Sequence, residues 1–267
     1  MELTELFGYL AALLIGIVLG LIGGGCSILT VPAFVYLFAI NPVTATAYSL
    51  FVVGITALIG AFQNLQKGLV DLKTAVVFAI PSFIAVYLTR RFLMPSIPEN
   101  LVTINDFTIT KNIAVMVFFA VIMLLASWSM IRNKRPEPEP GALITYNYPL
   151  IVIEGFIIGI LTGIVGAGGG FLIIPALVLL AKLPMKKAVA TSLLIIAVKS
   201  LIGFIGDIET MDLNWNFLIL FSFISIIGIF AGVKLNHFID GKKLKKAFGW
   251  FVLIMAIYIL LKETVLN

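Results

Sequence analysis

Ten apolar stretches of 13 to 21 residues follow one another along the chain, separated by polar connections. They cover 6–22, 28–40, 43–62, 72–88, 113–131, 150–165, 171–183, 185–205, 215–233 and 247–261. Hydrophobic residues make up 61% of the 267 residues and charged residues only 12%. Soluble domains average roughly 45–50% and about 25%, so this much apolar surface must face lipid. The sequence therefore predicts an all-α membrane protein with about ten transmembrane segments.

The two halves of the chain repeat one another. A shift of 143 residues aligns 16–60 with 159–203 without a gap, and 17 of the 45 pairs are identical. The identical pairs include several glycines and the prolines Pro32 and Pro175, which chance matching of apolar residues would not align. We expect a first transmembrane repeat at 1–131 and a second at 149–267. A polar linker rich in Pro and Glu, at 132–148, connects them.

The number of crossings decides how the two repeats are oriented. If every stretch crosses the membrane, each half spans five times and the second repeat is inverted. If the first two stretches of each half make one crossing together, each half spans four times and the repeats are parallel. Lys and Arg gather on the cytoplasmic side. Ten crossings divide them 13 to 4, and eight crossings at best 11 to 6. The sequence favours two inverted five-helix repeats, with the linker inside and both termini outside.

Two equivalent stretches are too short to span a bilayer as straight helices. Residues 28–40 and 171–183 number 13 each, and each stretch follows a glycine-rich run. A span needs roughly 20 residues. Glycines break helices and let backbone approach a ligand, and the next helix begins with unpaired, partly positive N–H groups. Packing through small residues would explain one such run. A matching pair favours an anion site between broken or short helices.

A polar stripe on the helix after each break supplies further candidates. At about 100° per residue, Ser192 and Lys199 share one helix face, and Ser49 and Thr56 occupy the equivalent positions of the first half. A lysine within a span costs at least about 2.5–3.5 kcal/mol and so usually faces a cavity or a partner. We therefore expect Lys199 to attract an anion. The alternative is that it snorkels to the interface or pairs with an internal acid.

The predicted substrate-binding residues come from both glycine runs and both stripes. They are Gly23, Gly24, Gly25, Cys26, Ser27, Ser49, Thr56, Gly166, Gly168, Gly169, Gly170, Thr191, Ser192 and Lys199. We predict no catalytic residue, metal site or cofactor, because the sequence has no metal-ligand cluster, P-loop or intramembrane His with paired carboxylates. Glu154, in the first turn of its predicted helix, is expected to complement the helix dipole.

The segments from Gly20 to Ala33 and from Gly166 to Leu177 resemble the TauE/SafE sulfite-exporter family of bacterial membrane proteins. The resemblance covers nearly the whole chain, including its duplication and central linker. It implies transport, often outward, of small sulfur-containing anions such as sulfite, sulfoacetate or related organosulfonates across the bacterial inner membrane. Cys26 and Lys199 depart from the residues that the family pattern suggests, which could alter the choice of substrate.

The most economical function is a membrane transporter, most simply an exporter, of small anions within the lipid bilayer. An anion channel of the same fold is one alternative, and its flux would not saturate. A membrane-embedded enzyme is less favoured, because the catalytic clusters are missing. We expect no nucleic-acid partner, since no basic run is interleaved with exposed aromatic residues. The oligomeric state stays open, a homo-oligomer included.

Overall fold

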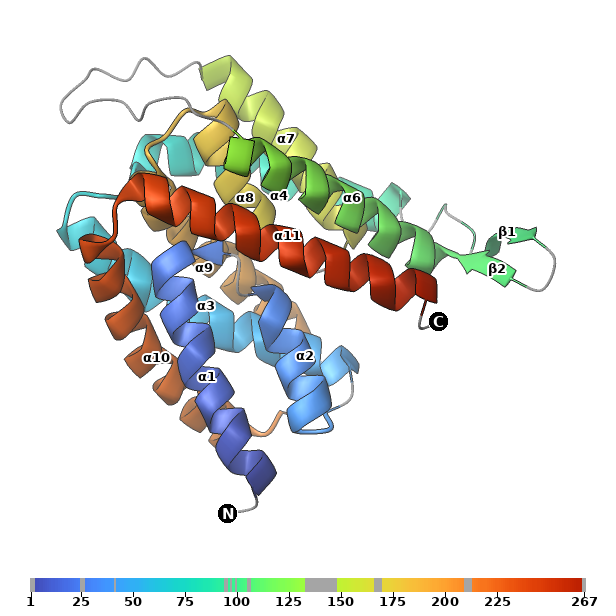
Figure 1. The fold of residues 1–267 in the computed structure, drawn as a ribbon, viewed down its shortest axis with the longest axis horizontal. Helices are drawn as coiled ribbons and strands as arrows, with labels where there is room; N and C mark the ends of the chain where they lie inside the picture. Colours follow the sequence, from blue (N-terminus) through green and yellow to red (C-terminus); the bar gives the residue numbers. More distant parts are fainter. Residues whose placement is uncertain are drawn as a thin grey trace.

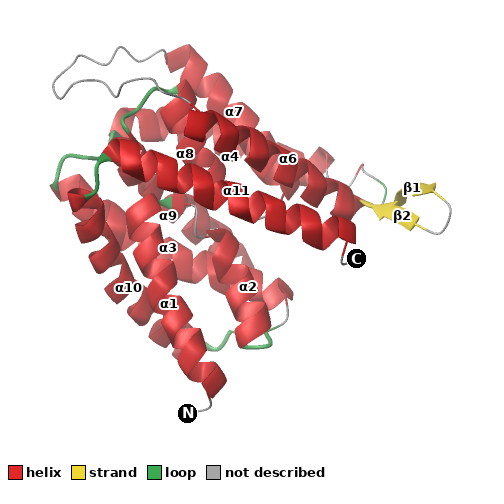
Figure 2. Cartoon of the chain, in the orientation of Figure 1, coloured by secondary structure: helices red, strands yellow, loops and turns green. Residues whose placement is uncertain are grey.

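The described part of the chain is helical apart from one β-hairpin and short connections (Figure 2). Within the described ranges, four helices are long and apolar enough to cross a membrane, and four further apolar helices are shorter. The prediction of a helical protein with apolar spans is thus confirmed. The computed structural model describes all residues except 1–2, 25–26, 41, 94–95, 97, 99, 105–106, 133–147, 166–169, 209–212 and 266–267.

Each predicted apolar stretch contains a helix. The elements are α1 (Leu3–Ile22), α2 (Ser27–Leu37), α3 (Pro42–Gln66), α4 (Leu72–Leu88), η2 (Thr89–Leu93), β1 (Asn100–Ile104), β2 (Phe107–Thr110), α6 (Lys111–Arg132), α7 (Tyr148–Val165), α8 (Gly170–Pro175), η3 (Ala176–Leu180), α9 (Met185–Ile208), α10 (Trp215–Phe238) and α11 (Gly241–Val265). The two η elements are π-helices that continue α4 and α8. Some helices extend beyond the predicted apolar stretches, as α11 does at its lysine-rich start, because a hydropathy pattern marks only the lipid-facing part of a helix.

The hairpin between η2 and α6 is a feature that the all-α prediction missed. Its strands are antiparallel, with Ile104 opposite Phe107 and Asn100 opposite Thr110. They lie between the fourth and fifth apolar stretches, where β-branched residues are frequent. Such residues favour strands, but the run is too short and too polar to register as a span. In Figure 1 the hairpin projects from the molecule just before the first turn of α6.

The two short helical segments end in the same way, 143 residues apart. Ala39 and Lys182 both have positive φ angles, 52° and 57°. In both copies the next N–H donates to a carbonyl six residues earlier: Ile40 to Phe34 (3.1 Å) and Leu183 to Leu177 (2.8 Å). A positive φ is uncommon outside glycine. Its occurrence at both equivalent positions shows that the two segments end in the same backbone turn, although α2 is α-helical throughout and α8 continues as a π-helix.

The first helix of each half packs on a helix of the other half. α1 lies against α10, and α7 lies against α4 (Figure 1). A Cβ atom on Gly16 would collide with the carbonyl of Ser225, and one on Gly159 with the carbonyl of Ser82. These two contacts are again 143 residues apart. Small residues let two helix backbones approach closely, so the halves interlock instead of forming separate bundles.

α3 and α9 form a second contact between the halves, and they run antiparallel. Gly54 lies against Leu201, whereas Gly60, later in α3, lies against Leu193, earlier in α9. α6 and α11 also pack side by side in opposite directions (Figure 1). The core between these pairs is filled by apolar side chains, of which Phe34, Phe78, Phe221 and Phe248 are fully buried.

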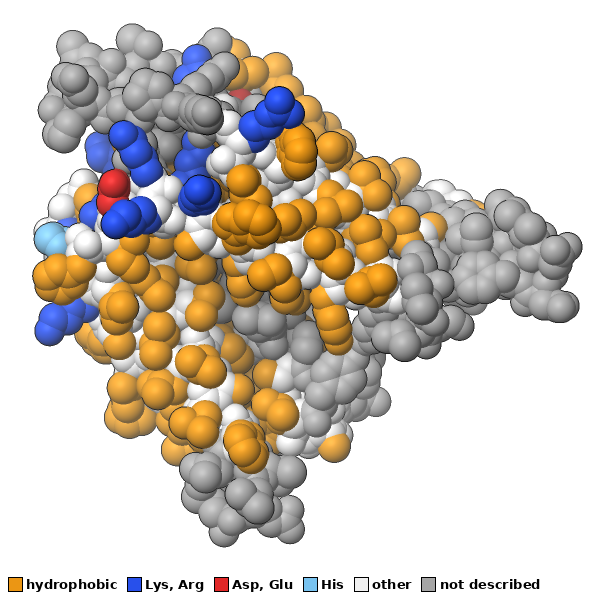
Figure 3. Space-filling view, in the orientation of Figure 1, with side chains coloured by type: hydrophobic (Ala, Val, Ile, Leu, Met, Phe, Trp, Pro, Cys, Tyr) orange, Lys and Arg blue, Asp and Glu red, His pale blue; other side chains and the backbone are white. Residues whose placement is uncertain are grey.

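The outer surface suits a lipid environment. Large hydrophobic side chains are exposed on most of the outer helices, for example Leu125 at 66% and Phe223 at 61%. On the face shown in Figure 3, Lys and Arg gather at one end of the molecule, and most of the remaining described surface is hydrophobic. A one-sided distribution of positive residues is typical of membrane proteins.

Substituting Gly159 by alanine is expected to weaken the α4–α7 contact. The added methyl group would meet the Ser82 carbonyl and, at 2.7 Å, the Cβ atom of Ala85. Overpacking of this kind costs about 1–3 kcal/mol, so the melting temperature of the purified protein in detergent should fall. Gly203→Ala is the matched control, since the nearest side-chain atom to its new methyl group is 3.5 Å away. Equal melting temperatures for the two variants would contradict the proposed role of this contact.

Candidate functional site

The first glycine break lies against the helix that follows the second break. Gly23 ends α1 with a φ of +74°, and its N–H donates to the carbonyl of Leu19 (2.7 Å). A Cβ atom on Gly23 would lie 2.6 Å from Oγ of Ser192 and 3.0 Å from Cδ1 of Ile174 in α8. Two predicted site residues, Gly23 and Ser192, are therefore in contact. The absence of a side chain at Gly23 lets α1, α8 and α9 converge.

The hydroxyl groups of α9 next to this break are buried and hydrogen-bonded. Thr191 is fully buried, and its Oγ1 accepts the backbone N–H of Asp71 (3.0 Å). Ser192 is also fully buried and donates to the carbonyl of Val189 (2.8 Å). Thr191 thus ties the α3–α4 connection to α9. The Ser192 hydroxyl uses its hydrogen in this bond, and its oxygen, beside Gly23, can still accept one.

The predicted polar stripes lie on the paired helices α3 and α9. In α3, Thr56 lies between Gly54 and Gly60. In α9, Lys199 lies between Leu193 and Leu201, the residues that these glycines contact. Thr56 and Lys199 therefore lie at the same level of the helix pair. Thr56 is fully buried, and its Oγ1 has no hydrogen-bond partner among the described residues. Lys199 is half-buried, and Ser49 is 6% exposed. Ser49 and Thr56 of the first stripe and Ser192 of the second therefore face the interior, whereas Lys199 is only partly covered.

Part of the predicted site lies outside the described residues. Gly24 is buried beside Gly23, Ser27 begins α2 and Gly170 begins α8. The predicted site residues that are not described are Gly25, Cys26, Gly166, Gly168 and Gly169. The structure thus describes the contact of Gly23 with Ser192 and with α8, and a meeting of the two glycine runs and their ligand contacts stay predictions.

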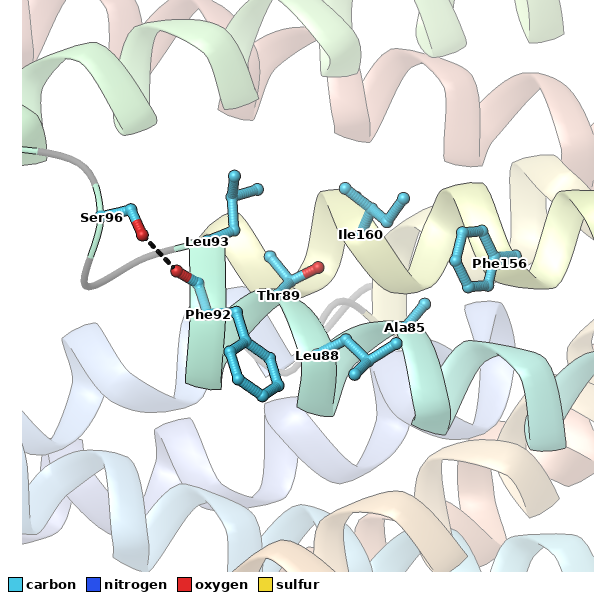
Figure 4. Close-up of a pocket in the computed structure, with 8 residues that line it drawn as sticks. All are labelled: Ala85, Leu88, Thr89, Phe92, Leu93, Ser96, Phe156 and Ile160. Atoms are coloured by element: carbon cyan, nitrogen blue, oxygen red, sulfur yellow. Dashed lines mark hydrogen bonds between the residues drawn. The ribbon is translucent and has the colours of Figure 1, made fainter.

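Two surface pockets of the described chain lie elsewhere. One, of about 340 Å³, lies between the α4–η2 helix and α7 and is lined mainly by apolar side chains, such as Phe92 and Phe156 (Figure 4). At its end Ser96 Oγ donates to the carbonyl of Phe92 (2.7 Å). A second, of about 180 Å³, lies between α3 and α10 beside Ser222. Neither pocket includes a predicted binding residue or a charged side chain, so neither is suited to an anion.

The end of α1 and the start of α4 are held by polar side chains that the sequence analysis did not select. Asn236 of α10 donates through Nδ2 to the carbonyl of Leu21 (2.6 Å), near the end of α1. Asp71 accepts the N–H of Thr74 (2.9 Å) and so caps α4. Helix ends leave carbonyl and N–H groups without intrahelical partners. Asp71, before an apolar run, carries a recognisable capping signal, whereas nothing in the sequence around Asn236 points to Leu21.

Glu154 occupies a different environment from the one expected. The sequence placed it in the first turn of its helix, but α7 begins at Tyr148, so Glu154 is the seventh residue. Its side chain is only 4% exposed, and neither carboxyl oxygen has a hydrogen-bond partner among the described residues. The expectation that Glu154 lies in the first turn and complements the helix dipole is therefore wrong.

Comparison with known proteins identifies a family that the chain matches over most of its length. Residues 8–259 match the model of the family described as sulfite exporter TauE/SafE. The chain is 29% identical to the "Probable membrane transporter protein YunE" of Bacillus subtilis, over 93% of this chain and 92% of that protein. It is 27% identical to a "Probable membrane transporter protein" of Xylella fastidiosa, over 92% and 91% of the two chains.

A third relative matches a shorter part of the chain. The "Probable membrane transporter protein MJ0441" of Methanocaldococcus jannaschii is 39% identical over 41% of this chain and 43% of its own length. No solved structure matches the chain. The family match extends over nearly the whole sequence and confirms the resemblance that the two glycine-rich segments indicated. The chain belongs to the sulfite exporter TauE/SafE family.

Proposed function

We propose that this protein is a multi-pass membrane transporter that moves small anions, sulfur-containing ones such as sulfite and sulfoacetate first among them, out of the cell. The observation that carries the proposal is the contact of Gly23, in the first break, with Ser192 and with α8 behind the second break. Helix starts beside flexible backbone offer N–H groups with partial positive charge to an anion. Transporters commonly bind their substrates where two broken helices meet.

We further propose ten crossings, arranged as two inverted repeats. Gly8 of α1 lies against the ring of Phe38, just after α2, so α2 folds back along α1 and counts as a crossing of its own. In a ten-span protein α3 is the third and α9 the eighth crossing, and the two run in opposite directions. In an eight-span protein they would be the second and the sixth and would run in the same direction. The antiparallel pairing of α3 and α9 supports ten.

Lys199 and Thr56 supply the charge and a hydroxyl group for the proposed path. They lie at the same level of α9 and α3, and the Thr56 hydroxyl has no partner among the described residues. A buried polar group without a partner is costly. An anion that reached this level would accept a hydrogen bond from Thr56 and be attracted by the lysine. This region is closely packed, so an anion would reach it only when the helices move apart during alternating access.

The membrane potential provides a driving force in the outward direction. The lysine-rich end of the molecule is the cytoplasmic side in the proposed topology, which is that of a bacterial inner membrane protein (Figure 3). An inside-negative potential favours the exit of an anion by about 2.3 kcal/mol per charge per 100 mV. Export of an anion therefore needs no nucleotide hydrolysis.

Reconstitution into proteoliposomes tests the function directly. We expect saturable efflux of radiolabelled sulfite or sulfoacetate, accelerated when the compartment that holds the anion is made negative by a potassium gradient with valinomycin. Flux that rises linearly with concentration and gives single-channel currents would indicate a channel instead. Absence of flux for a panel of sulfur oxyanions, sulfonates and carboxylates would refute the proposal.

Thr56→Val is expected to weaken anion binding without harming the fold. The substitution removes a buried hydroxyl group that has no partner among the described residues, so stability should be unchanged or higher. A hydrogen bond to a charged group contributes about 1.5–3 kcal/mol, so the half-saturating anion concentration should rise roughly tenfold or more. Thr74→Val is the matched control, because Thr74 in α4 is equally buried and its hydroxyl also lacks a described partner. The same change in affinity for both variants would exclude a specific role for Thr56.

Lys199→Met separates the charge of this side chain from its packing. Methionine retains the length and most of the apolar stem but removes the ammonium group, so anion affinity should fall at least tenfold. Lys199→Arg should restore part of the loss, since it returns the positive charge. Flux measurements on both variants check this. An unchanged affinity in Lys199→Met would show that the lysine pairs within the protein and does not attract the substrate.

A further inference from the structure

Glu154 is a buried acidic side chain in the middle of the apolar helix α7. The residue is 4% exposed, and both carboxyl oxygens are buried without a hydrogen-bond partner among the described residues. We propose that Glu154 binds and releases a proton during the transport cycle and thereby couples anion movement to proton movement. This inference rests on the proposed transport function.

The surroundings of Glu154 are apolar. At about 100° per residue, Glu154 shares a buried stripe of α7 with Ile151 and Ile158, next to the stripe whose glycines pack on α4. Gly155, the following residue, lies against the carbonyl of Phe78 and, at 3.1 Å, the Cγ atom of Pro81. On α7 itself the buried neighbours of Glu154 are therefore apolar, and the adjacent contact with α4 is made by backbone and a proline ring.

Charged groups on the neighbouring elements lie at other levels. α4, η2, α6, α8 and η3 pack on α7. On α4, Lys73 and Tyr87 are exposed, and each lies at least five residues along the helix from the segment Phe78–Pro81 that contacts Gly155. The sequences of α8 and η3 contain no titratable residue. On α6 and η2, the titratable residues lie at the helix ends or outside the described side chains: Lys111, Arg132, Arg90 and Arg91. Of these, Arg132 is exposed and stacks on Trp128, 5.6 Å from the ring centre.

An ionised carboxylate in this position would be strongly destabilised. A buried charge without a partner or hydrogen bonds is far more costly than a neutral group. Acidic residues inside membrane proteins therefore face water-filled cavities, pair with other groups or act in proton relays. Burial without a described partner therefore favours the neutral, protonated carboxyl group over the carboxylate in the conformation described here. Release of the proton requires a second conformation in which water reaches Glu154.

This requirement links the proton to alternating access. The carboxylate takes up a proton from water on one side, which forms its O–H bond, and returns that proton to water on the other side. No electron transfer or further reactant is needed. Glu154 lies on the helix that leads into the second glycine run, about 18 Å further along at ~1.5 Å per residue. A movement of α7 that exposes Glu154 would therefore also move the second break.

The residue of the first half that is equivalent to Glu154 supports a specialised role for this glutamate. A shift of 143 residues aligns Glu154 with Ala11, which is partly buried in α1. The glycine contacts that follow the two positions, at Gly16 and Gly159, are repeated. The first half therefore makes its helix pair with a small apolar side chain at this place. The carboxyl group is thus not needed to build such a pair.

Proton coupling can be measured with sulfoacetate and a pH-sensitive dye trapped in proteoliposomes. Sulfoacetate suits the assay because neither its sulfonate nor its carboxylate carries a proton near pH 7. In the wild-type protein, addition of sulfoacetate should move protons, and a pH gradient should drive its accumulation. In Glu154→Gln, substrate-dependent proton movement should fall at least tenfold, while exchange of labelled for unlabelled sulfoacetate stays within about twofold. Asp240→Asn, which neutralises an exposed acid, should leave both unchanged.

Glu154→Leu provides a second variant, in which an apolar side chain of similar size replaces the carboxyl group. It should melt at a higher temperature than the wild type, exchange sulfoacetate and move no protons. Wild-type proton movement in either variant, or sulfoacetate transport without protons by the wild-type protein, would overturn the proposal. A loss of exchange in both folded variants would do the same, because it indicates a structural role. A wild-type protein that moves none of the tested anions would instead refute transport itself.

Discussion

Close contact between helix backbones across the two halves is the constraint on which this structure depends. In the bilayer, apolar side chains gain nothing by leaving lipid for one another, so helices associate through packing at short range. Gly16 on Ser225 and Gly159 on Ser82 allow that approach at equivalent places. These contacts place α1 beside α10 and α7 beside α4, and so fix where α1 ends. The position of Gly23 against Ser192 and α8 follows from them.

Much of the fold could be predicted from the sequence because its signals are local and repeated. The apolar stretches indicate the helices, and the glycine runs mark the places where α1 ends at Gly23 and α8 begins at Gly170. The hairpin was not predicted, because its strands are short and lie in a polar connection. The helix ends beyond the apolar layer, such as the lysine-rich start of α11, carry no hydropathy signal.

The candidate site could be predicted only in part, for a physical reason. The periodicity of a helix indicates which residues share a face, as for Ser192 and Lys199, but not which helix lies opposite. The contact between Gly23 and Ser192 depends on how three helices converge. The burial of Glu154 depends on where α7 begins and on its neighbours, which a single helix pattern does not contain. The surroundings of individual side chains were therefore less predictable than the positions of the helices along the chain.

The scaffold is nearly symmetric, whereas its ionisable side chains are not. Thr56 and Ala11 occupy the positions equivalent to Lys199 and Glu154, so these two ionisable side chains belong to the second half. The equivalent backbone contacts show that the first half provides the same shape without the charges. A duplicated fold can in this way retain one copy for geometry while the other acquires chemistry.

The interlocked arrangement of the halves also has a consequence for biosynthesis. α1 leaves the ribosome early, but its packing partner α10 begins only at Trp215. At about 5–20 residues per second, α1 waits roughly 10–40 s in the bilayer with its glycine face unpartnered. Assembly must therefore finish after translation of most of the chain. A premature stop after α9 would leave the earliest helix without its partner, so late truncations should be as damaging as early ones.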